Sequence, residues 1–298
     1  MPEMTNAFPG KDIAPDDIVS KFPLAAKKSP EHVSRFTIAG VEFGGGAVPI
    51  MAGPNMVESR ELILDVAARV KASGAAFLRG GAFKPLTFPY RSATYRETRE
   101  DGIAWLAEAK AACGIPVITE VMEERHLSMV AEVADIIQIG SRNMQNYPFL
   151  TACARTGTPL MLKRHYGASL RDWLGAAEYL LVEGNDKVLL CERGVVAPHT
   201  HRATSRYLLD LQVVPAAKEM THLPVLVDPS HATFWAPWVT PMALAAVAAG
   251  ADGLMVEVHP DPRNAAVDPL QPLDYAGFVA LVRGVEATRV ATRAATRP

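Results

Sequence analysis

Short apolar runs alternate with helical patterns from about residue 48 to the end of the chain. Eight such runs occur, and they lack a clean polar alternation, as expected of strands that are covered on both faces. The predicted strands are Pro49–Ala52, Ala75–Arg79, Pro116–Glu120, Asp135–Ile139, Pro159–Lys163, Lys187–Glu192, Pro224–Asp228 and Gly253–Glu257. This order indicates a parallel sheet with crossover helices between its strands.

The segments that separate these runs have helical periodicity. In the fifth of them, one apolar stripe is formed by Leu170, Trp173, Leu174, Ala177 and Leu181, which follow one another at steps of three or four. Several segments end near a glycine, which is typical of a helix C-cap. The predicted helices are Arg60–Ala72, Glu100–Cys113, Glu124–Val133, Tyr147–Thr156, Leu170–Glu183, Thr204–Lys218, Pro241–Ala248 and Leu273–Ala287.

The fold class predicted by this pattern is α/β, a closed (β/α)8 TIM barrel, because eight strand–helix units in about 240 residues match that fold in count and size. An open doubly wound sheet more often has fewer strands and a glycine-rich first turn. Ahead of the barrel, Phe36–Ile38 and Val41–Phe43 predict a short hairpin that would close its N-terminal mouth. The expected parts are an N-terminal arm at 1–35, one barrel domain at 36–290 and a flexible tail at 291–298.

Composition excludes several classes of protein. The 298 residues are 49% hydrophobic and 21% charged, which is too apolar for a disordered chain. A net charge of -2 argues against a nucleic-acid partner. No apolar stretch approaches the roughly 18 residues of a membrane span, and no signal sequence is visible, so we expect a cytoplasmic protein without a membrane partner. The three cysteines lack the spacing of a zinc site or a disulfide scaffold.

Charged side chains stand at or just after the C-terminal end of every predicted strand, where barrel enzymes place their active groups. Solvated loop charges would explain any one of these residues, but they explain the whole set poorly. Four cations from separate strands would converge within a ring about 10–15 Å across, where only an anion would relieve their repulsion. These cations are Arg79, Arg142, Lys163 and Arg193. We therefore expect a small polyanionic ligand.

A second group consists of His231, Glu257 and Asp268. An imidazole and two carboxylates can bind a divalent cation such as Mn, Fe or Zn. The same groups can instead orient a water molecule and transfer protons. Their irregular spacing leaves a metal site and a structural ion-pair network equally open.

Eight short motifs, one around the end of each predicted strand, carry a family resemblance. They are AGPNMVES, RGGAFKP, ITEVM, IQIGSRNMQN, LMLKR, LLCERG, HLPVLVDPSHAT and GLMVEVHPDP. In one register over about residues 36–285, they resemble the single-domain (type I beta) 3-deoxy-D-arabino-heptulosonate 7-phosphate (DAHP) synthase family, which is related to 3-deoxy-D-manno-octulosonate 8-phosphate synthase. The resemblance implies a (β/α)8 transferase of the shikimate pathway of aromatic amino acid biosynthesis. In its aldolase-like reaction, C3 of phosphoenolpyruvate attacks an aldehyde, water adds at C2, and C–O cleavage releases phosphate.

The resemblance also implies roles for individual residues. The four cations would hold the phosphate and carboxylate of phosphoenolpyruvate, and Lys163 would also transfer a proton. Glu120 would position the attacking water, and Lys84 would reach toward the aldehyde. Gln138 and Asp228 would brace their neighbours. The usual substrates are therefore phosphoenolpyruvate and erythrose 4-phosphate, in a homo-oligomer that is a dimer or tetramer.

In the same comparison, His231, Glu257 and Asp268 match three of the family's four metal ligands, which polarise the aldehyde carbonyl. The fourth is usually a Cys, but this chain has Asn55. An amide oxygen binds soft divalent ions more weakly than a thiolate does, and metal-independent octulosonate-phosphate synthases also carry Asn there. We therefore count Asn55 and His231 with Lys163 and Glu120 as catalytic, and expect that Mn or a similar ion is not required. The alternative is a lost ligand in an inactive relative.

Other differences from the family's motifs concern residues that would contact the acceptor aldehyde. The family's KPRT motif has Leu86 in place of its Arg, and the loss of such a charge-assisted contact with the acceptor phosphate costs about 1.5–3 kcal/mol. Arg206 keeps its place as a substrate contact in a loop that gains His199 and His201.

Aromatic residues stand where the family has cations after the seventh predicted strand, namely Phe234, Trp235 and Trp238. These changes favour a less charged, non-phosphorylated aldehyde in a specialised pathway, although the tryptophans could equally pack a loop or a subunit interface. A different class of function, a non-catalytic relative that binds phosphoenolpyruvate or a partner enzyme, is disfavoured because Glu120 and Lys163 are retained.

Overall fold

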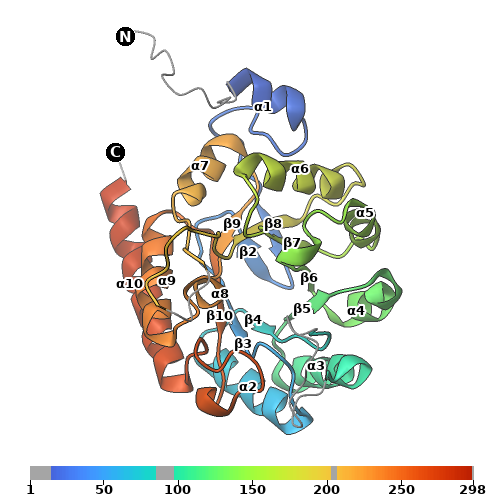
Figure 1. Cartoon of the computed structure of the whole chain (residues 1–298), viewed down its shortest axis with the longest axis vertical. Helices are drawn as coiled ribbons and strands as arrows, with labels where there is room; N and C mark the ends of the chain where they lie inside the picture. Colours follow the sequence, from blue (N-terminus) through green and yellow to red (C-terminus); the bar gives the residue numbers. More distant parts are fainter. Residues whose placement is uncertain (1–14, 85–96, 203–206, 297–298) are drawn as a thin grey trace.

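Eight parallel strands close into a barrel in the computed structural model, which describes residues 15–84, 97–202 and 207–296. Hydrogen bonds join them in the order β10-β3-β4-β5-β6-β7-β8-β9, and Leu254 of β10 pairs with Ile50 of β3 to complete the circle. The predicted (β/α)8 fold is confirmed (Figure 1). The strands are β3 (Ile50–Gly53), β4 (Phe77–Arg79), β5 (Val117–Val121), β6 (Ile136–Ile139), β7 (Leu160–Lys163), β8 (Val188–Glu192), β9 (Val225–Val227) and β10 (Gly253–Glu257).

Helices surround the barrel and bury one face against it (Figure 1). In α6 the predicted apolar stripe is the buried face, with Trp173 and Ala177 fully covered, and Ser169 and Asp172 form a capping box at its start. The helices are α2 (Arg60–Ala72), α3 (Arg99–Cys113), α4 (Leu127–Val133), α5 (Tyr147–Arg155), α6 (Leu170–Leu181), α7 (Val213–Met220), α8 (Pro229–Thr233), α9 (Ala236–Ala248) and α10 (Tyr275–Thr296). Short 3-10 turns are η1 (Glu124–His126), η2 (Ser141–Asn143) and η3 (Pro262–Asn264).

Three helix boundaries differ from the prediction. The helix expected at Thr204–Lys218 begins only at Val213, because Pro215 lacks an N–H and is tolerated in the first turn of a helix but not in its interior. The N–H of Val213 donates to Asp210 Oδ1 at 3.2 Å, which satisfies the new helix start. Helix α9 begins before the expected Pro241, at Ala236.

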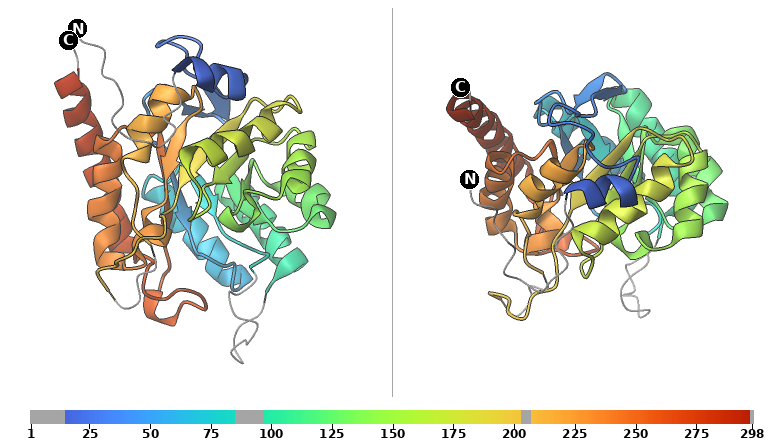
Figure 2. Two further views of the ribbon diagram at one scale, coloured as in Figure 1. Left: turned by 45° about the horizontal axis from the view of Figure 1, so that its top comes forward. Right: turned by 90° about the horizontal axis from the view of Figure 1, so that it is seen from above.

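Helix α10 continues to Thr296, through residues that we expected to form a flexible tail. Its last turns are rich in alanine and arginine, which are strong helix formers. Figure 2 shows α10 along one side of the molecule, beside α9.

The predicted hairpin is formed by β1 (Phe36–Ile38) and β2 (Val41–Phe43), with Ala39 and Gly40 at positive φ in its turn. Its side chains pack against the inward-facing apolar residues of the barrel strands, and the rings of Phe43 and Phe77 lie 5.9 Å apart. These apolar residues come from the N-terminal halves of the strands, so the hairpin closes that mouth. The opposite mouth is left for polar groups.

The N-terminal arm is partly docked on the barrel. Helix α1 (Pro15–Lys21) leads to Phe22, which is buried with Ala25. Glu178 Oε1 of α6 accepts the N–H groups of Leu24 and Ala25 at 2.9 and 2.6 Å. Figure 1 shows α1 beside α6 and α7. The apolar residues of the arm thus gain a packing surface that its proline- and charge-rich composition did not indicate.

The three cysteines are free thiols, and Cys153 and Cys191 are buried among core residues, as expected. None of the described helices has the length and apolar character needed to cross a membrane.

Candidate active site

The polar strand ends meet at the C-terminal mouth of the barrel, where they line a cavity of about 230 Å³. The residues predicted from the sequence that line it are Lys84, Glu120, Gln138, Arg142, Lys163, Arg193, His231 and Asp268. Convergence of cations from separate strands is therefore observed. The position of Arg206 lies outside the described residues.

Sequence reasoning missed five lining residues, which are Gly140, Ser141, Tyr166, Tyr207 and Val267. Gly140 and Ser141 directly follow β6, so their place at a strand end was the available signal. Tyr207 has no such signal, because it is far along the loop from β8 and reaches the cavity only through the fold of that loop.

The cations of the cavity differ in how they are held. Lys163 is buried and donates to Asp228 Oδ2 at 2.5 Å. The guanidinium of Arg193 is also buried and lies 4.5 Å from the centre of the Tyr207 ring. Arg142 is exposed at the rim. Burial lowers the pKa of Lys84, although Glu120 opposes this shift. Positive charge therefore faces the cavity from several sides, which suits a small anion.

Arg79 is placed differently from the other predicted phosphoenolpyruvate ligands. Its Nη1 lies 3.2 Å from Oε1 of Glu257, and both side chains are buried. It does not appear among the described residues that line the cavity. Arg79 is therefore paired with Glu257 in this structure, behind the residues that line the cavity.

A continuous row of charged groups runs behind the cavity. Asp228 Oδ2 contacts both Lys163 Nζ and His231 Nδ1, the second at 2.7 Å, and His231 Nε2 lies 3.0 Å from Glu257 Oε1. With the Arg79 contact, the row alternates basic and acidic side chains from β7 to β4.

Local structure explains how His231 enters this row. Asp228 is the N-cap of α8 and its Oδ1 accepts the N–H of His231 at 3.0 Å, while Pro229 begins the helix. Asp at the N-cap and Pro at the first helical position are both strongly favoured. The sequence DPSH thus fixes the imidazole beside Asp228.

The two buried carboxylates of the row are ionised. Burial by itself would raise the pKa of Asp228, but His231 and Lys163 outweigh this and bring it well below its ordinary value. Burial likewise acts to raise the pKa of Glu257, but His231 and Arg79 lower it to about 2. Each ring nitrogen of His231 faces one of these carboxylates, Nδ1 that of Asp228 and Nε2 that of Glu257.

Glu120 at the end of β5 is held over the cavity by two neighbours on the next strand. Gln138 Nε2 donates to Glu120 Oε2 at 3.0 Å. The other oxygen passes so close to Gly140 that a Cβ there would lie only 1.9 Å from Oε1. Glycine is therefore required at position 140 for the carboxylate to keep this place.

The residues that match the family's metal position gather beside the cavity and are partly paired with one another, while the buried Oδ1 of Asn55 has no hydrogen-bond partner among the described residues. Asn55 Nδ2 donates to Asp268 Oδ2 at 2.9 Å, and His231 is held between Asp228 and Glu257. Within the described ranges, no three His, Cys, Asp or Glu side chains are grouped so as to hold a metal ion. An amide in place of a thiolate further weakens the donor set.

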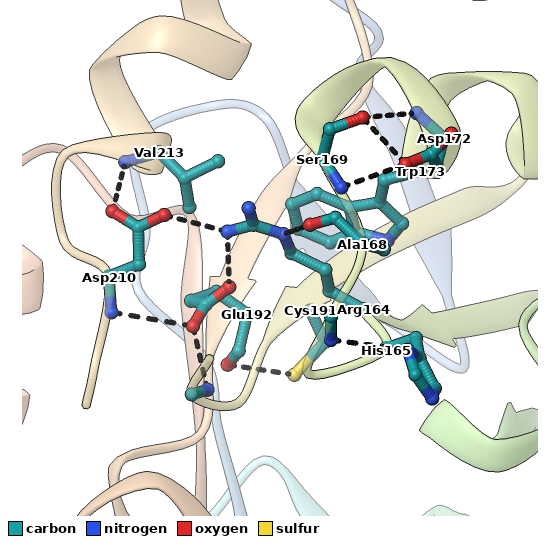
Figure 3. A network of polar contacts seen from close by, with 12 residues as sticks. Arg164, His165, Ala168, Ser169, Asp172, Trp173, Cys191, Glu192, Asp210 and Val213 are labelled. Carbon is teal, nitrogen blue, oxygen red and sulfur yellow. Dashed lines mark hydrogen bonds and ion pairs between the residues drawn. The ribbon is translucent and has the colours of Figure 1, made fainter. Parts of the chain in front are cut away.

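A second network, shown in Figure 3, supports the loops beside the cavity. Arg164 Nη1 contacts Glu192 Oε2 at 3.0 Å and Asp210 Oδ2 at 2.8 Å, and its Nε donates to Ala168 O at 2.9 Å. Glu192 Oε1 also accepts the N–H of Gly194 at 2.6 Å. Arg164 and Glu192, which also stand at strand ends, are thus structural and join β7, β8 and the start of α7.

We expect Arg164→Ala to lower the free energy of unfolding by about 3–5 kcal/mol, because it leaves the buried carboxylate of Glu192 without its partner. Burial raises the pKa of Glu192 even with Arg164 in place. The measurement is urea denaturation at neutral pH. Arg155→Ala is the matched control, since Arg155 pairs with Glu183 at the surface and its loss should change little. Equal effects of the two substitutions would contradict this role.

The aromatic residues after β9 contact the loop between β8 and α7. The guanidinium of Arg202 lies 3.6 Å from the centre of the Trp235 ring, and the rings of His201 and Trp238 meet edge to face at 6.5 Å. Phe234 ends α8 at positive φ. His199 is exposed. Trp235 thus contacts this loop through Arg202, and Trp238 through His201.

Comparisons with known proteins agree with this geometry. A family model described as the DAHP synthetase I family matches residues 22–292. A phospho-2-dehydro-3-deoxyheptonate aldolase from Thermotoga maritima is 39% identical over 266 residues, which are 89% of this chain and 77% of that protein. A 2-dehydro-3-deoxyphosphooctonate aldolase from Nitrosococcus oceani is 30% identical over 247 residues, with 78% of this chain and 86% of that protein covered.

Solved structures show the same relationship. The crystal structure of the Thermotoga maritima DAHP synthase matches with a TM-score of 0.84 at 38% identity, and covers 90% of this chain and 77% of that one. A truncated form of the same synthase matches with a TM-score of 0.82 at 37% identity, over 91% and 97% of the two chains. With its closed barrel and a family-model match over residues 22–292, this chain belongs to the DAHP synthetase I family.

Proposed function

We propose that this protein condenses phosphoenolpyruvate with an aldehyde and releases phosphate. The observation that carries the proposal is the convergence of Lys84, Arg142, Lys163 and Arg193, from separate strands, on one cavity that also contains Glu120. Guanidinium and ammonium groups bind phosphate and carboxylate by charge-assisted hydrogen bonds. Repulsion among these cations is relieved when a dianionic or trianionic substrate enters.

The reaction divides among the residues of the cavity. Arg142 and Arg193 hold the anionic groups of phosphoenolpyruvate. C3 of phosphoenolpyruvate forms a bond to the aldehyde carbon, whose oxygen takes a proton from Lys163. Water directed by Glu120 adds at C2, and the bond from C2 to the phosphate oxygen then breaks to release inorganic phosphate.

Asp228 and His231 prepare the proton transfer in this scheme. Asp228 contacts Lys163 Nζ and His231 Nδ1 through the same oxygen. A buried carboxylate at this position holds the ammonium proton in place until the aldehyde oxygen takes it. Lys163 is then reprotonated from solvent or from the row behind it.

Family membership is compatible with a divalent metal ion, and we propose that turnover does not require one. The proposal is supported by the chemistry of the possible metal ligands. Asn55 replaces the thiolate, and its amide nitrogen donates a hydrogen bond to Asp268. We expect phosphate release to continue at an unchanged rate in excess chelator, and added Mn to raise it less than twofold. Strict dependence on Mn would overturn this proposal.

The acceptor aldehyde is proposed to carry less charge than erythrose 4-phosphate. This rests on Leu86 in the sequence, which lies outside the described residues, and on the aromatic side chains that follow β9. Lys84 lines the cavity, where it would orient the aldehyde oxygen.

The decisive experiment measures phosphate release from phosphoenolpyruvate with a panel of phosphorylated and non-phosphorylated aldehydes. We expect kcat/KM to be higher for non-phosphorylated aldehydes than for erythrose 4-phosphate. Equal or better turnover of erythrose 4-phosphate would make the protein an ordinary shikimate-pathway enzyme. Absence of turnover with every aldehyde, but binding of phosphoenolpyruvate, would support a non-catalytic role. We also propose a homo-oligomer, dimer or tetramer, which sedimentation velocity would test.

A further inference from the structure

A second cavity adjoins the first on the far side of Tyr207. It has a volume of about 380 Å³ and lies between the loop after β8, helix α8 and the start of α9. This volume is within the range of small-molecule pockets, about 300–1,000 Å³. The side chains that define it include His201, Tyr207, Leu208, Ala232, Trp238 and Met242.

The two cavities share structural elements. Tyr207 lines both of them, and its ring is stacked on the Arg193 guanidinium of the first. In α8, His231 lines the catalytic cavity and the next residue, Ala232, lines the second. The two cavities are therefore lined by successive residues of α8 and by Tyr207 in common.

The chemistry of the second cavity is apolar and aromatic. Among the described residues that line it, none is Lys, Arg, Asp or Glu. The nearby cation Arg202 is stacked on the Trp235 ring at 3.6 Å. A phosphate placed here would lose its hydration without gaining a charged partner from the described lining residues, whereas an alkyl or aryl group would be removed from water at no such cost.

We propose that this cavity binds an apolar or aromatic substituent of the acceptor aldehyde, while the carbonyl group lies in the catalytic cavity. The inference rests on the proposed function and specifies the class of acceptor. Tyr207, which lines both cavities and contacts Arg193, would lie beside the part of the acceptor that joins its reacting end to its apolar end.

The test compares 3-phenylpropanal with propanal, which share the reacting group and differ in the ring. Leu208→Trp would fill the cavity, and it suits the test because Leu208 is 37% exposed and can accept a larger side chain. We expect kcat/KM for 3-phenylpropanal to fall at least tenfold, with kcat/KM for propanal and the KM for phosphoenolpyruvate unchanged. Leu24→Trp is the matched control, since Leu24 is 39% exposed and belongs to the N-terminal arm.

Met242→Trp fills the same cavity from α9 and should give the same selective loss, which protects the test against misfolding of one variant. An equal change for both aldehydes, or no change for either, would overturn the inference. Calorimetry with the unreactive alcohol 3-phenylpropanol tests binding in the second cavity separately from the proposed function. Binding that Leu208→Trp abolishes, without turnover of any aldehyde, would refute the proposed function but keep the ligand class. Turnover of propanal without binding of the alcohol would refute the proposed ligand class but keep the proposed function.

Discussion

Replacing Lys163 with alanine is expected to lower kcat for phosphate release by about 10²–10⁴-fold, the usual contribution of a positioned general acid. Lys163 Nζ lines the catalytic cavity, and Asp228 holds it at 2.5 Å. The substitution removes both the proton donor and one cation of the phosphoenolpyruvate site. The measurement is steady-state phosphate release with the best aldehyde of the panel.

Lys187→Ala provides the control for Lys163→Ala. Lys187 directly precedes β8 and so stands at the opposite, N-terminal end of the barrel, and its backbone contact to Leu160 survives the change. The control should keep full activity. If Lys163→Ala retained more than a tenth of the wild-type rate while folded, the assignment of the cavity as the active site would be wrong.

Gly140→Ala should lower kcat about 100-fold, because small displacements of a catalytic group have effects of that size. The new Cβ would lie 1.9 Å from Glu120 Oε1, and the carboxylate would have to move out of its place above the cavity. Since Gly140 has no positive φ, the backbone itself tolerates alanine. We expect the melting temperature to fall much less than the activity.

Gly175→Ala is the matched control for Gly140→Ala. A Cβ at position 175 would make an ordinary contact of 3.5 Å with Phe22, and alanine is favoured inside helix α6. This variant should be fully active. Similar activities of the two variants would show that the position of Glu120 is not critical.

The strands and most helices were predictable because burial on both faces leaves a continuous apolar run, and helical periodicity fills the intervals. Most of the cavity followed from the same pattern. Residues such as Glu120, Lys163 and His231 come at the ends of recognisable strands, and barrel geometry brings all such ends to one mouth. The late start of α7 at Val213 was missed, although Pro215 was a visible signal for it.

The sequence by itself determined the barrel, the closed N-terminal mouth and which residue types reach the active mouth, because these depend on local periodicity and on strand order. Only the tertiary structure decided how those residues pair. Lys163 meets Asp228 across β8, and Arg79 meets Glu257 across β3. In a barrel, inward-facing side chains of alternate strands share one layer, so residues far apart in the chain become partners through closure of the sheet. Tyr207 reaches the cavity for a related reason, since the course of a long loop is set by what it packs against.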